Sequence, residues 1–305
     1  MSASMYLLTD EVTHAVEQKR PVVALESSVI SQGLPWPENL ETALAAEDAV
    51  RSTGAVPATI AVLDGKIRVG LNHIQLERLA DPKNVFIKAS RRDLSAVIAH
   101  QKSAATTVAS TMWIAAQAGI SVFATGGIGG VHPQEHSPFD ISSDLSELAR
   151  TPVLVVCAGA KSILDLRRTL ELLETFGVPV IGFRTDEFPA FYSRSSGLPT
   201  SGRIETPEEA AHLFEVHRQL HGAGMLLCQP LSSDVALDPD SVQSMLDIAQ
   251  RDAFTGSIRG PELTPYLLRR LSESSGGRTL IANRMLIVDN ARLAGQIAVE
   301  LAEDQ

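Results

Sequence analysis

Short apolar runs alternate with stretches of helical spacing along most of the chain. Continuous apolar runs are typical of strands buried on both faces, and they predict strands over 22–25, 56–63, 122–124, 153–157, 180–183 and 225–228. Apolar side chains at helical spacing predict helices over 39–51, 106–118, 162–176 and most of 241–301. The pair Asp64-Gly65 predicts a turn after the second strand, and adjacent threonines at 106 and 107 mark a helix start.

This alternation of strands and helices predicts an α/β fold in which helices cover a largely parallel sheet. No internal repeat, low-complexity tract or linker-like segment interrupts the pattern. In such folds the ligand site lies beyond the carboxyl ends of the strands. We therefore examine the residues that follow each predicted strand.

Composition narrows the classes of function. The chain has 305 residues, 44% of them hydrophobic, with 26 Lys and Arg against 36 Asp and Glu and a net charge of −10. That is the composition of a globular protein, and the negative charge argues against a nucleic-acid partner, because phosphate neutralisation needs a basic surface. A local basic pocket for one small phosphorylated molecule stays compatible with it.

The cysteines and the N-terminus bear on the cellular compartment. Cys157 and Cys228 each lie in an apolar run, which predicts buried strand thiols and no disulfide or zinc framework. Asp10 and Glu11 stand where a signal peptide would need an apolar stretch. The longest apolar run, 152–160, is too short to span a bilayer. We therefore expect a cytoplasmic protein with no membrane partner.

Two charged residues accompany predicted strands near the N-terminus. Glu26 directly follows the strand 22–25, and Lys88 is predicted to end a strand that begins near residue 85. A catalytic or binding role is one interpretation of both. For Glu26 the alternative is a helix cap or a solvated loop acid, and for Lys88 it is a surface cluster.

A glycine-rich segment, GGIGG at 126–130, follows the strand 122–124. Its backbone amides could approach an anionic ligand closely, whereas a plain tight turn is the alternative. The segment is not a dinucleotide fingerprint, because His132 occupies the place of the third glycine.

Two carboxylates and two serines lie close together at 140–144. Asp140 and Asp144 are four residues apart and would share a helix face, and Ser142 and Ser143 would offer hydroxyls and amides to a phosphate. Oxygen ligands of this kind suit magnesium or manganese rather than zinc. A capped helix start explains the same spacing, and the spacing alone does not decide.

A lysine, Lys161, follows the apolar strand at 153–157 and precedes a predicted helix. The segment is not a P-loop, because Val155 and Ala160 stand where that motif needs glycine. Partial burial and a nearby cation such as Lys88 would favour the neutral amine that a Schiff base requires. A phosphate-binding lysine is equally compatible. The residues alone thus indicate an α/β enzyme for a small anionic ligand.

At these residues the sequence closely resembles the pseudouridine-5'-phosphate glycosidase family. The similar stretches keep one order from residue 24 to 197, and a weaker match follows with IAN (281–283) and DNARLAGQIA (289–298). The main stretches are ALESSVISQGLPWP (24–37), PATIAVLDGKIRVGL (57–71), KASRRDL (88–94), TTVASTM (106–112), VFATGGIGGVH (122–132), FDISSDLSELARTPVLVVCAGAKSILD (139–165) and TDEFPAFYSRSSG (185–197).

The resemblance implies an enzyme that interconverts pseudouridine 5'-phosphate plus water with uracil and ribose 5-phosphate. It further implies an α/β/α sandwich around a largely parallel or mixed sheet, a homotrimer and a divalent metal, usually Mn²⁺. One glycosidase domain is then expected to occupy 1–305, with no fused sugar-kinase domain.

The resemblance also assigns roles to residues. Lys161 is expected to be the nucleophile that forms a covalent adduct with the sugar, Glu26 the proton donor and Asp140 the metal ligand. The residues expected to bind substrate are Lys88, Val108, Ser142, Ser143 and Asp144, with His132 and Asn283 near the uracil.

The chain departs from the family pattern in places, and other functions remain open. Gln32 stands where histidine is expected, Trp36 where tyrosine is common, and the segment 133–138 is less basic than usual. The segment 184–203 is either a lid over the site or a structural loop. The alternative functions are another lysine-dependent sugar-phosphate lyase or aldolase, and a non-catalytic sugar-phosphate binding protein.

Overall fold

The computed structural model describes residues 5–133, 140–256, 258 and 263–303. Its strands form one sheet in the order β1-β4-β3-β2-β7-β8-β11-β9-β10, and β6, which pairs with β3, carries β5 at its other edge. The strands are β1 (Tyr6–Leu8), β2 (Val22–Leu25), β3 (Val56–Leu63), β4 (Lys66–Val69), β5 (Ile87–Ala89), β6 (Ala104–Thr106), β7 (Val122–Ala124), β8 (Leu154–Cys157), β9 (Val180–Phe183), β10 (Gly202–Ile204) and β11 (Met225–Cys228).

The sheet is mixed and mostly parallel, as expected. β3 pairs antiparallel with β4 and with β6, and the other pairings are parallel. The predicted turn at Asp64 and Gly65 joins β3 to β4, and both residues have positive φ angles, 51° and 72°. Continuous burial along β2, β3, β8, β9 and β11 explains why their sequences are apolar without alternation.

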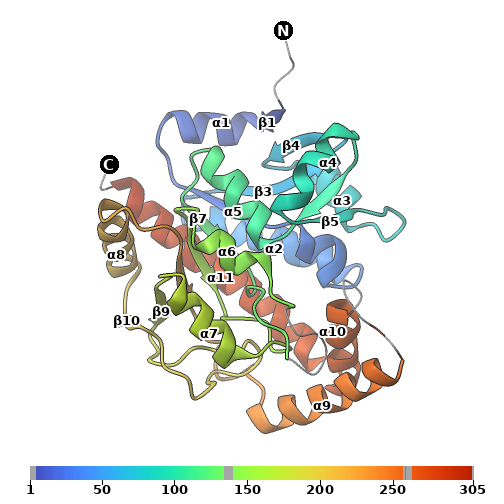
Figure 1. The fold of residues 1–305 in the computed structure, drawn as a ribbon. Coiled ribbons are helices and arrows are strands. Elements are labelled where there is room, and N and C mark those ends of the chain that lie inside the picture. Colours follow the sequence, from blue (N-terminus) through green and yellow to red (C-terminus); the bar gives the residue numbers. More distant parts are fainter. Residues whose placement is uncertain (1–4, 134–139, 257, 259–262, 304–305) are drawn as a thin grey trace.

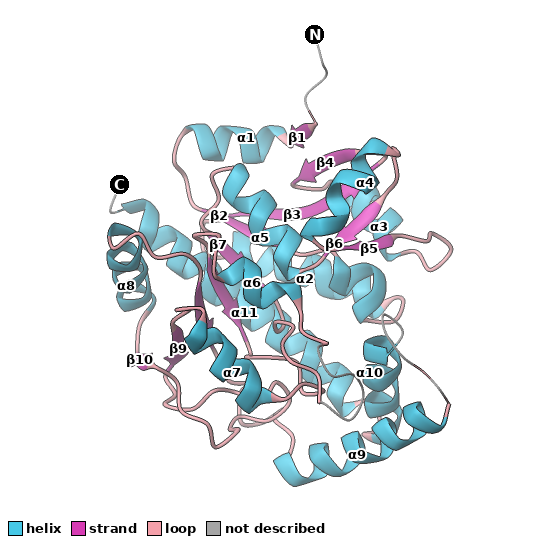
Figure 2. Ribbon diagram, viewed as in Figure 1, coloured by secondary structure: helices cyan, strands magenta, loops and turns pink. Residues whose placement is uncertain are grey.

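Helices cover both faces of the sheet, which confirms the expected α/β/α sandwich (Figures 1 and 2). The long helix α11 packs against α2, α8 and the strands β2, β7 and β8, while α1 and α5 pack against β2 and β3. The helices are α1 (Asp10–Glu17), α2 (Glu38–Arg51), α3 (His73–Ala80), α4 (Leu94–Ala99), α5 (Val108–Gln117), α6 (Ser143–Leu148), α7 (Leu166–Thr175), α8 (Pro207–Gln219), α9 (Pro239–Thr255), α10 (Leu263–Ser274) and α11 (Arg278–Glu303). A short π-helix (Val29–Gly33) and a 3₁₀ turn (Arg91–Asp93) complete them.

Two predicted helix starts were wrong. Thr106 belongs to β6, where its hydroxyl donates to the carbonyl of Ile60, so α5 begins only at Val108. The helix expected from Ser162 begins at Leu166, because Asp165 caps it by accepting a hydrogen bond from the amide of Arg168. The intervening turn separates Lys161 from α7.

Cys157 and Cys228 are buried strand thiols, as predicted. They end β8 and β11 and are register partners, and their thiols are free and share a weak hydrogen bond with the Sγ atoms 4.0 Å apart. No helix within the described residues is long and apolar enough to cross a bilayer. The assignment of 1–305 to one domain stays a prediction.

Candidate active site

Three neighbouring strands deliver the main candidate residues to one edge of the sheet. β2, β7 and β8 are adjacent and parallel, with Leu25 opposite Ala124 and Ala124 opposite Val156. Glu26 directly follows β2, the glycine-rich segment follows β7, and Lys161 comes four residues after β8. The parallel register therefore brings these segments together at the carboxyl edge, where α/β ligands bind.

A narrow inner cavity of about 40 Å³ lies at this edge. It adjoins a wider outer hollow of about 660 Å³, since the two have Gln32, Gly33, Leu268 and Asn283 in common. Four of the side chains predicted to act on or bind the substrate, Glu26, Lys88, Lys161 and Asn283, line the inner cavity, whereas Val108, His132, Ser142, Ser143 and Asp144 do not. The other residues of the lining are Ser28, Val29, Gln32, Gly33, Gly126, Gly127, Phe191 and Leu268.

Glu26 is fixed in the inner cavity by two hydroxyl groups. Ser28 donates to Oε2 and Thr125 donates to Oε1, and the glutamate is only 6% exposed. Glu26 is therefore neither a solvated loop acid nor a helix cap. The sequence analysis did not identify Ser28 and Thr125 as site residues. Both follow strands closely, and that position could have indicated them.

The backbone around Lys161 holds it at the end of β8. Its amide donates to the carbonyl of Ile128 (3.1 Å), and its carbonyl accepts from the amide of Leu164 (3.0 Å). Gly159, two residues earlier, has φ +82°, and a Cβ there would lie 2.3 Å from the carbonyl oxygen of Pro189. The turn that presents the lysine thus needs glycine both for its conformation and for its space.

We expect Gly159→Ala to destabilise the fold by at least about 2 kcal/mol, from the left-handed backbone and the clash with Pro189 together. Urea unfolding measures the loss. Gly177→Ala is the matched control, because Gly177 also has a positive φ (+69°) but no atom lies within 4 Å of its added Cβ. A Gly159 variant no less stable than the Gly177 variant would contradict the steric argument.

Lys88 joins Lys161 in the inner cavity from a different part of the sheet. It lies in the middle of β5, not at the end of a strand as predicted, with Lys88 opposite Ala105 of β6. Lys88 is exposed as a residue, but it also lines the inner cavity, and protein atoms crowd around its amine. Burial, and secondly the positive charge of Lys161, hold the pKa of Lys88 below its usual value. A bound anion would relieve both effects.

The glycine-rich segment is crowded by side chains from several elements. A Cβ at Gly127 would lie 2.6 Å from the ring of Phe191, and one at Gly130 would lie 2.4 Å from the hydroxyl of Thr169. The amide of Gly129 donates to Oδ2 of Asp144 (2.8 Å), so it does not face a ligand. A Cβ at Gly129 would also clash, with the side chain of Ser142, so close packing accounts for Gly127, Gly129 and Gly130. The interpretation that the amides of this segment approach an anionic ligand is corrected for Gly129.

Asp144 ties the glycine-rich segment to α5. Its Oδ1 accepts from the amide of Ala109 (2.9 Å) while Oδ2 accepts from Gly129, and the residue is buried. Val108, the first residue of α5, is also buried. Both carboxylate oxygens of Asp144 therefore bind backbone amides, and substrate binding by Val108 and Asp144 stays a prediction.

Ser142 and Ser143 begin α6. Ser142 is its N-cap and accepts from the amide of Asp144 (3.2 Å), as the capped-helix interpretation expected. The hydroxyl of Ser143 lies 2.7 Å from that of Ser90, which comes two residues after Lys88. This contact brings the serines near β5, and their role toward a phosphate stays a prediction.

Asp140 does not share a helix face with Asp144, contrary to expectation. It precedes α6, and its carbonyl accepts from the amide of His132 (2.9 Å). The segment before it, 134–139, lies outside the described residues. Within the described ranges no three His, Cys, Asp or Glu residues form a metal-binding group. With Asp144 held by amides, the donor set fits a divalent cation held by one carboxylate and mostly by water.

Asn283 reaches the inner cavity from α11, far along the chain. It is 6% exposed, and its Oδ1 has no hydrogen-bond partner among the described residues. A Cβ at Gly126 would lie 3.6 Å from this oxygen. The structure thus brings Asn283 to the cavity that Glu26 and Lys161 line, as the resemblance implied, whereas His132 is not part of that lining.

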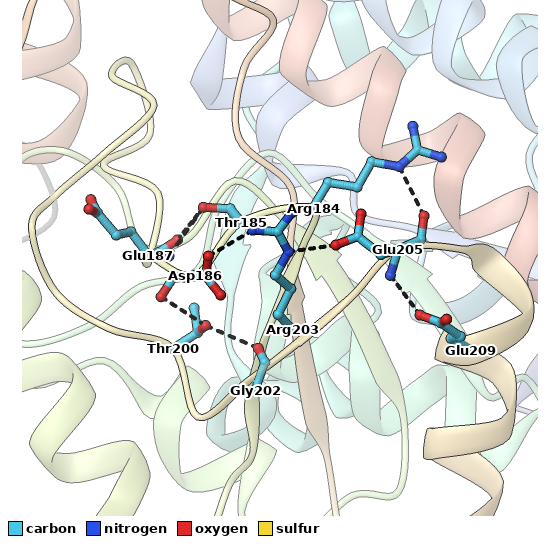
Figure 3. A network of polar contacts seen from close by, with 9 residues as sticks. All are labelled: Arg184, Thr185, Asp186, Glu187, Thr200, Gly202, Arg203, Glu205 and Glu209. Atoms are coloured by element: carbon cyan, nitrogen blue, oxygen red, sulfur yellow. Dashed lines mark hydrogen bonds and ion pairs between the residues drawn. The ribbon is translucent and has the colours of Figure 1, made fainter.

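The segment 184–203 forms a packed wall of the site. Phe188, Phe191 and Tyr192 are buried, and Phe191 lines the inner cavity. The ends of the segment are joined by a polar network, in which Arg203 donates to Asp186 (2.7 Å) and to Glu205 (2.6 Å) (Figure 3). This packing favours the structural interpretation over a lid that stands away from the core.

Comparisons with known proteins show the family of the chain. Residues 11–300 match the family described as indigoidine synthase A like protein. A pseudouridine-5'-phosphate glycosidase from Caldanaerobacter subterraneus subsp. tengcongensis is 52% identical over 295 residues, covering 96% of each chain. Another of the same name, from Solibacter usitatus, is 53% identical over 299 residues, covering 97% of this chain and all of the relative.

Two solved structures share the fold over 99% of both chains. The prealnumycin C-glycosynthase AlnA in complex with ribulose 5-phosphate is 41% identical, with a TM-score of 0.91. An indigoidine synthase A-like protein from Thermotoga maritima is 35% identical, with a TM-score of 0.89. With its fold and nearly its whole length in common with these proteins, the chain belongs to the pseudouridine-5'-phosphate glycosidase family, among the indigoidine synthase A like proteins.

Proposed function

We propose that the protein reversibly cleaves the C–C glycosidic bond of pseudouridine 5'-phosphate, giving uracil and ribose 5-phosphate. The observation that carries the proposal is the meeting of Lys161, Glu26 and Lys88 in one inner cavity at the carboxyl edge of the sheet. The names of the relatives supply the substrate, and the ribulose 5-phosphate bound by AlnA is a ligand of the same sugar-phosphate class.

The chemistry of the substrate explains why these residue types are needed. In pseudouridine the sugar C1′ is bonded to carbon 5 of uracil, so the leaving group is a carbon. Two carboxylates suffice for an oxygen leaving group, but a carbon must be protonated as it departs, and C1′ must be stabilised. The amine of Lys161 attacks C1′ as the C1′–O4′ bond breaks, and the proton that the nitrogen loses goes to O4′, which opens the sugar ring. The lone pair of the bound nitrogen then stabilises C1′, because it forms an iminium as the C–C bond breaks.

In this mechanism the electrons of the C1′–C5 bond remain on uracil, and Glu26 supplies the proton that C5 gains. Water then hydrolyses the Lys161 iminium to the aldehyde of ribose 5-phosphate and restores the free amine. In the direction of synthesis uracil C5 attacks the iminium, and Glu26 removes the proton. Lys88 supplies positive charge for the phosphorylated sugar.

Product analysis tests this function against the lyase alternative. We expect purified protein, given uracil and ribose 5-phosphate, to form pseudouridine 5'-phosphate, which chromatography with mass spectrometry identifies. Ribose in place of ribose 5-phosphate is the control for phosphate recognition. Cleavage of ribose 5-phosphate itself, with no use of uracil, would support the aldolase-like lyase instead. Binding of the sugar phosphate without any product would support the non-catalytic alternative.

We expect sugar-phosphate affinity to fall as pH rises through the lowered pKa of Lys88. A bound phosphate stabilises the protonated amine, so binding is coupled to proton uptake wherever free Lys88 has begun to deprotonate. Ribitol 5-phosphate is the suitable ligand because it has no carbonyl to react with Lys161, and calorimetry in buffers of different ionisation enthalpy counts the protons. Lys88→Arg keeps its charge and should reduce this pH dependence; an unchanged profile would contradict the assignment.

The proposal includes Mn²⁺ with Asp140 as its protein ligand. The ion would orient water and phosphate oxygens near the sugar. We expect chelation to remove most of the activity, Mn²⁺ to restore it, and Asp140→Asn to raise the Mn²⁺ concentration needed for half activity by about 10-fold or more. Asp186→Asn, in the network of Figure 3, is the control. Full activity after chelation would remove the metal from the mechanism.

A homotrimer in the cytoplasm completes the proposal. It rests on the family resemblance, and light scattering of the purified protein tests the assembly.

A further inference from the structure

Two buried amide oxygens without hydrogen-bond partners flank the join between the two cavities. Among the eight such side-chain atoms within the described residues, only Oε1 of Gln32 and Oδ1 of Asn283 belong to residues that line the inner cavity. A buried acceptor without a donor destabilises the protein, and this cost is regained when a ligand supplies the donor. The pair therefore indicates a ligand with N–H or O–H groups at this place.

The orientation of Gln32 is set by a hydrogen bond on its other side. Nε2 donates to the carbonyl of Phe86 (3.1 Å), so Oε1 is the atom left for a ligand. The neighbouring backbone is the short π-helix Val29–Gly33, which packs against α10 and α2. The side-chain amide of Gln32 is therefore fixed in orientation, and its acceptor Oε1 has no hydrogen-bond partner among the described residues.

The size of the cavities places a ligand's base at their join. About 40 Å³ of inner cavity cannot enclose a whole nucleotide, while the reactive side chains Glu26 and Lys161 both line it. A base bonded to the reacting C1′ must then extend toward the 660 Å³ hollow. The residues in common to both cavities, which include Gln32 and Asn283, border that path.

We propose that Gln32 is a specificity residue for the base, accepting a hydrogen bond from a ring N–H of uracil through Oε1. This rests on the function proposed above. A uracil bonded through carbon 5 keeps two ring N–H donors, N1–H and N3–H, and the wall offers two unpartnered amide acceptors. A site built around such acceptors rejects bases that lack the matching donor.

Equilibrium binding of uracil, 1-methyluracil and 3-methyluracil tests the proposal, with ribitol 5-phosphate present because it cannot react with Lys161 or with the base. Gln32→Met keeps the length of the side chain but removes the acceptor. We expect it to weaken uracil binding by about 10- to 100-fold, and to weaken equally the methyluracil that retains the contacted N–H. Binding of the other methyluracil should not weaken, and its identity assigns the contact to N1 or N3.

The difference among the three bases distinguishes a direct contact of Gln32 with the base from an indirect effect of a displaced backbone. Loss of the bond to Phe86 alone would weaken all three compounds by the same factor, and that result would overturn the proposal. Ser31→Ala is the matched control, since Ser31 is the adjacent residue and also has a buried unpartnered oxygen, but it lines neither cavity. Its uracil affinity should equal that of the wild type.

The result is also distinguishable from a failure of the proposed function. Wild-type protein that binds uracil selectively but forms no pseudouridine 5'-phosphate would refute the reaction and leave the role of Gln32 standing. Wild-type protein that forms the product, with the same discrimination among the three bases in Gln32→Met, would refute the role of Gln32 and leave the reaction standing. Absence of uracil binding to the wild type would overturn the assignment of Gln32.

Discussion

Lys161→Ala should abolish turnover, lowering kcat by at least about 10⁴-fold, while the fold remains intact. Lys161 is half-buried in the turn after β8, and its position is set by backbone hydrogen bonds to Ile128 and Leu164, which alanine keeps. Without the amine no iminium forms at C1′, so nothing stabilises the electron-deficient C1′ when the C–C bond breaks. Assays with pseudouridine 5'-phosphate in one direction and with uracil plus ribose 5-phosphate in the other measure the loss.

Borohydride trapping tests directly whether Lys161 forms a covalent bond with the sugar. Wild-type protein incubated with ribose 5-phosphate and borohydride should carry a reduced pentose phosphate on Lys161, located by peptide mass spectrometry. Lys161→Ala should carry none there. Lys102→Ala is the matched control, because Lys102 is exposed and lines neither cavity. Robust turnover of the Lys161 variant would exclude the Schiff-base mechanism.

Glu26→Gln should lower cleavage by about 10²- to 10⁴-fold, the usual contribution of one general acid–base group. Glutamine has the same shape, and the hydroxyls of Ser28 and Thr125 can rotate to accept as well as donate, so the local hydrogen bonds survive. What is lost is the proton that uracil C5 must gain. Turnover of both substrate pairs, with a thermal unfolding curve to verify the fold, is the measurement.

The two variants are distinguishable by trapping. Glu26→Gln should still form the Lys161 adduct with ribose 5-phosphate, because that step does not involve uracil C5, whereas Lys161→Ala should not. Ser28→Ala removes one of the two hydroxyls that hold Glu26 and should cost less than Glu26→Gln itself. Near-normal turnover of the Glu26 variant would mean that another group moves the proton.

Local sequence pattern predicted much of the fold. The strands at 22–25, 56–63, 122–124, 180–183 and 225–228 have the bounds that the structure shows, because short apolar runs have one stable place, the interior of a covered sheet. Errors fell at the ends of helices. Thr106 and Ser162 fit a helical pattern. In the structure, however, Thr106 pairs within the sheet as the last residue of β6, and Ser162 precedes α7, which begins after its N-cap Asp165.

The sequence predicted several residues that belong to the site, but not how they are arranged in space. Glu26, Lys88, Lys161 and Asn283 were each identified from the sequence or from its resemblance to a family, and one cavity unites them. Their neighbours Ser28, Thr125, Gln32 and Phe191 were not assigned to it, since small polar and aromatic residues after strands have many other uses. The two backbone amides that hold Asp144 could not be predicted from its position in the sequence, and its binding of substrate stays a prediction.

The sequence by itself determined the buried strands β2, β3, β7, β8, β9 and β11, several of the helices and the chemical types placed at the strand ends, but not the strands β1, β4, β6 and β10. These depend on periodicity and on turn chemistry within a few residues, which any single chain displays. Only the tertiary structure decided which polar atoms find partners. Hydrogen bonding and burial depend on contacts between residues far apart in the chain, such as Asp144 with Ala109. It is for this reason that the unpartnered oxygens of Gln32 and Asn283, and the site they border, became visible only in the folded protein.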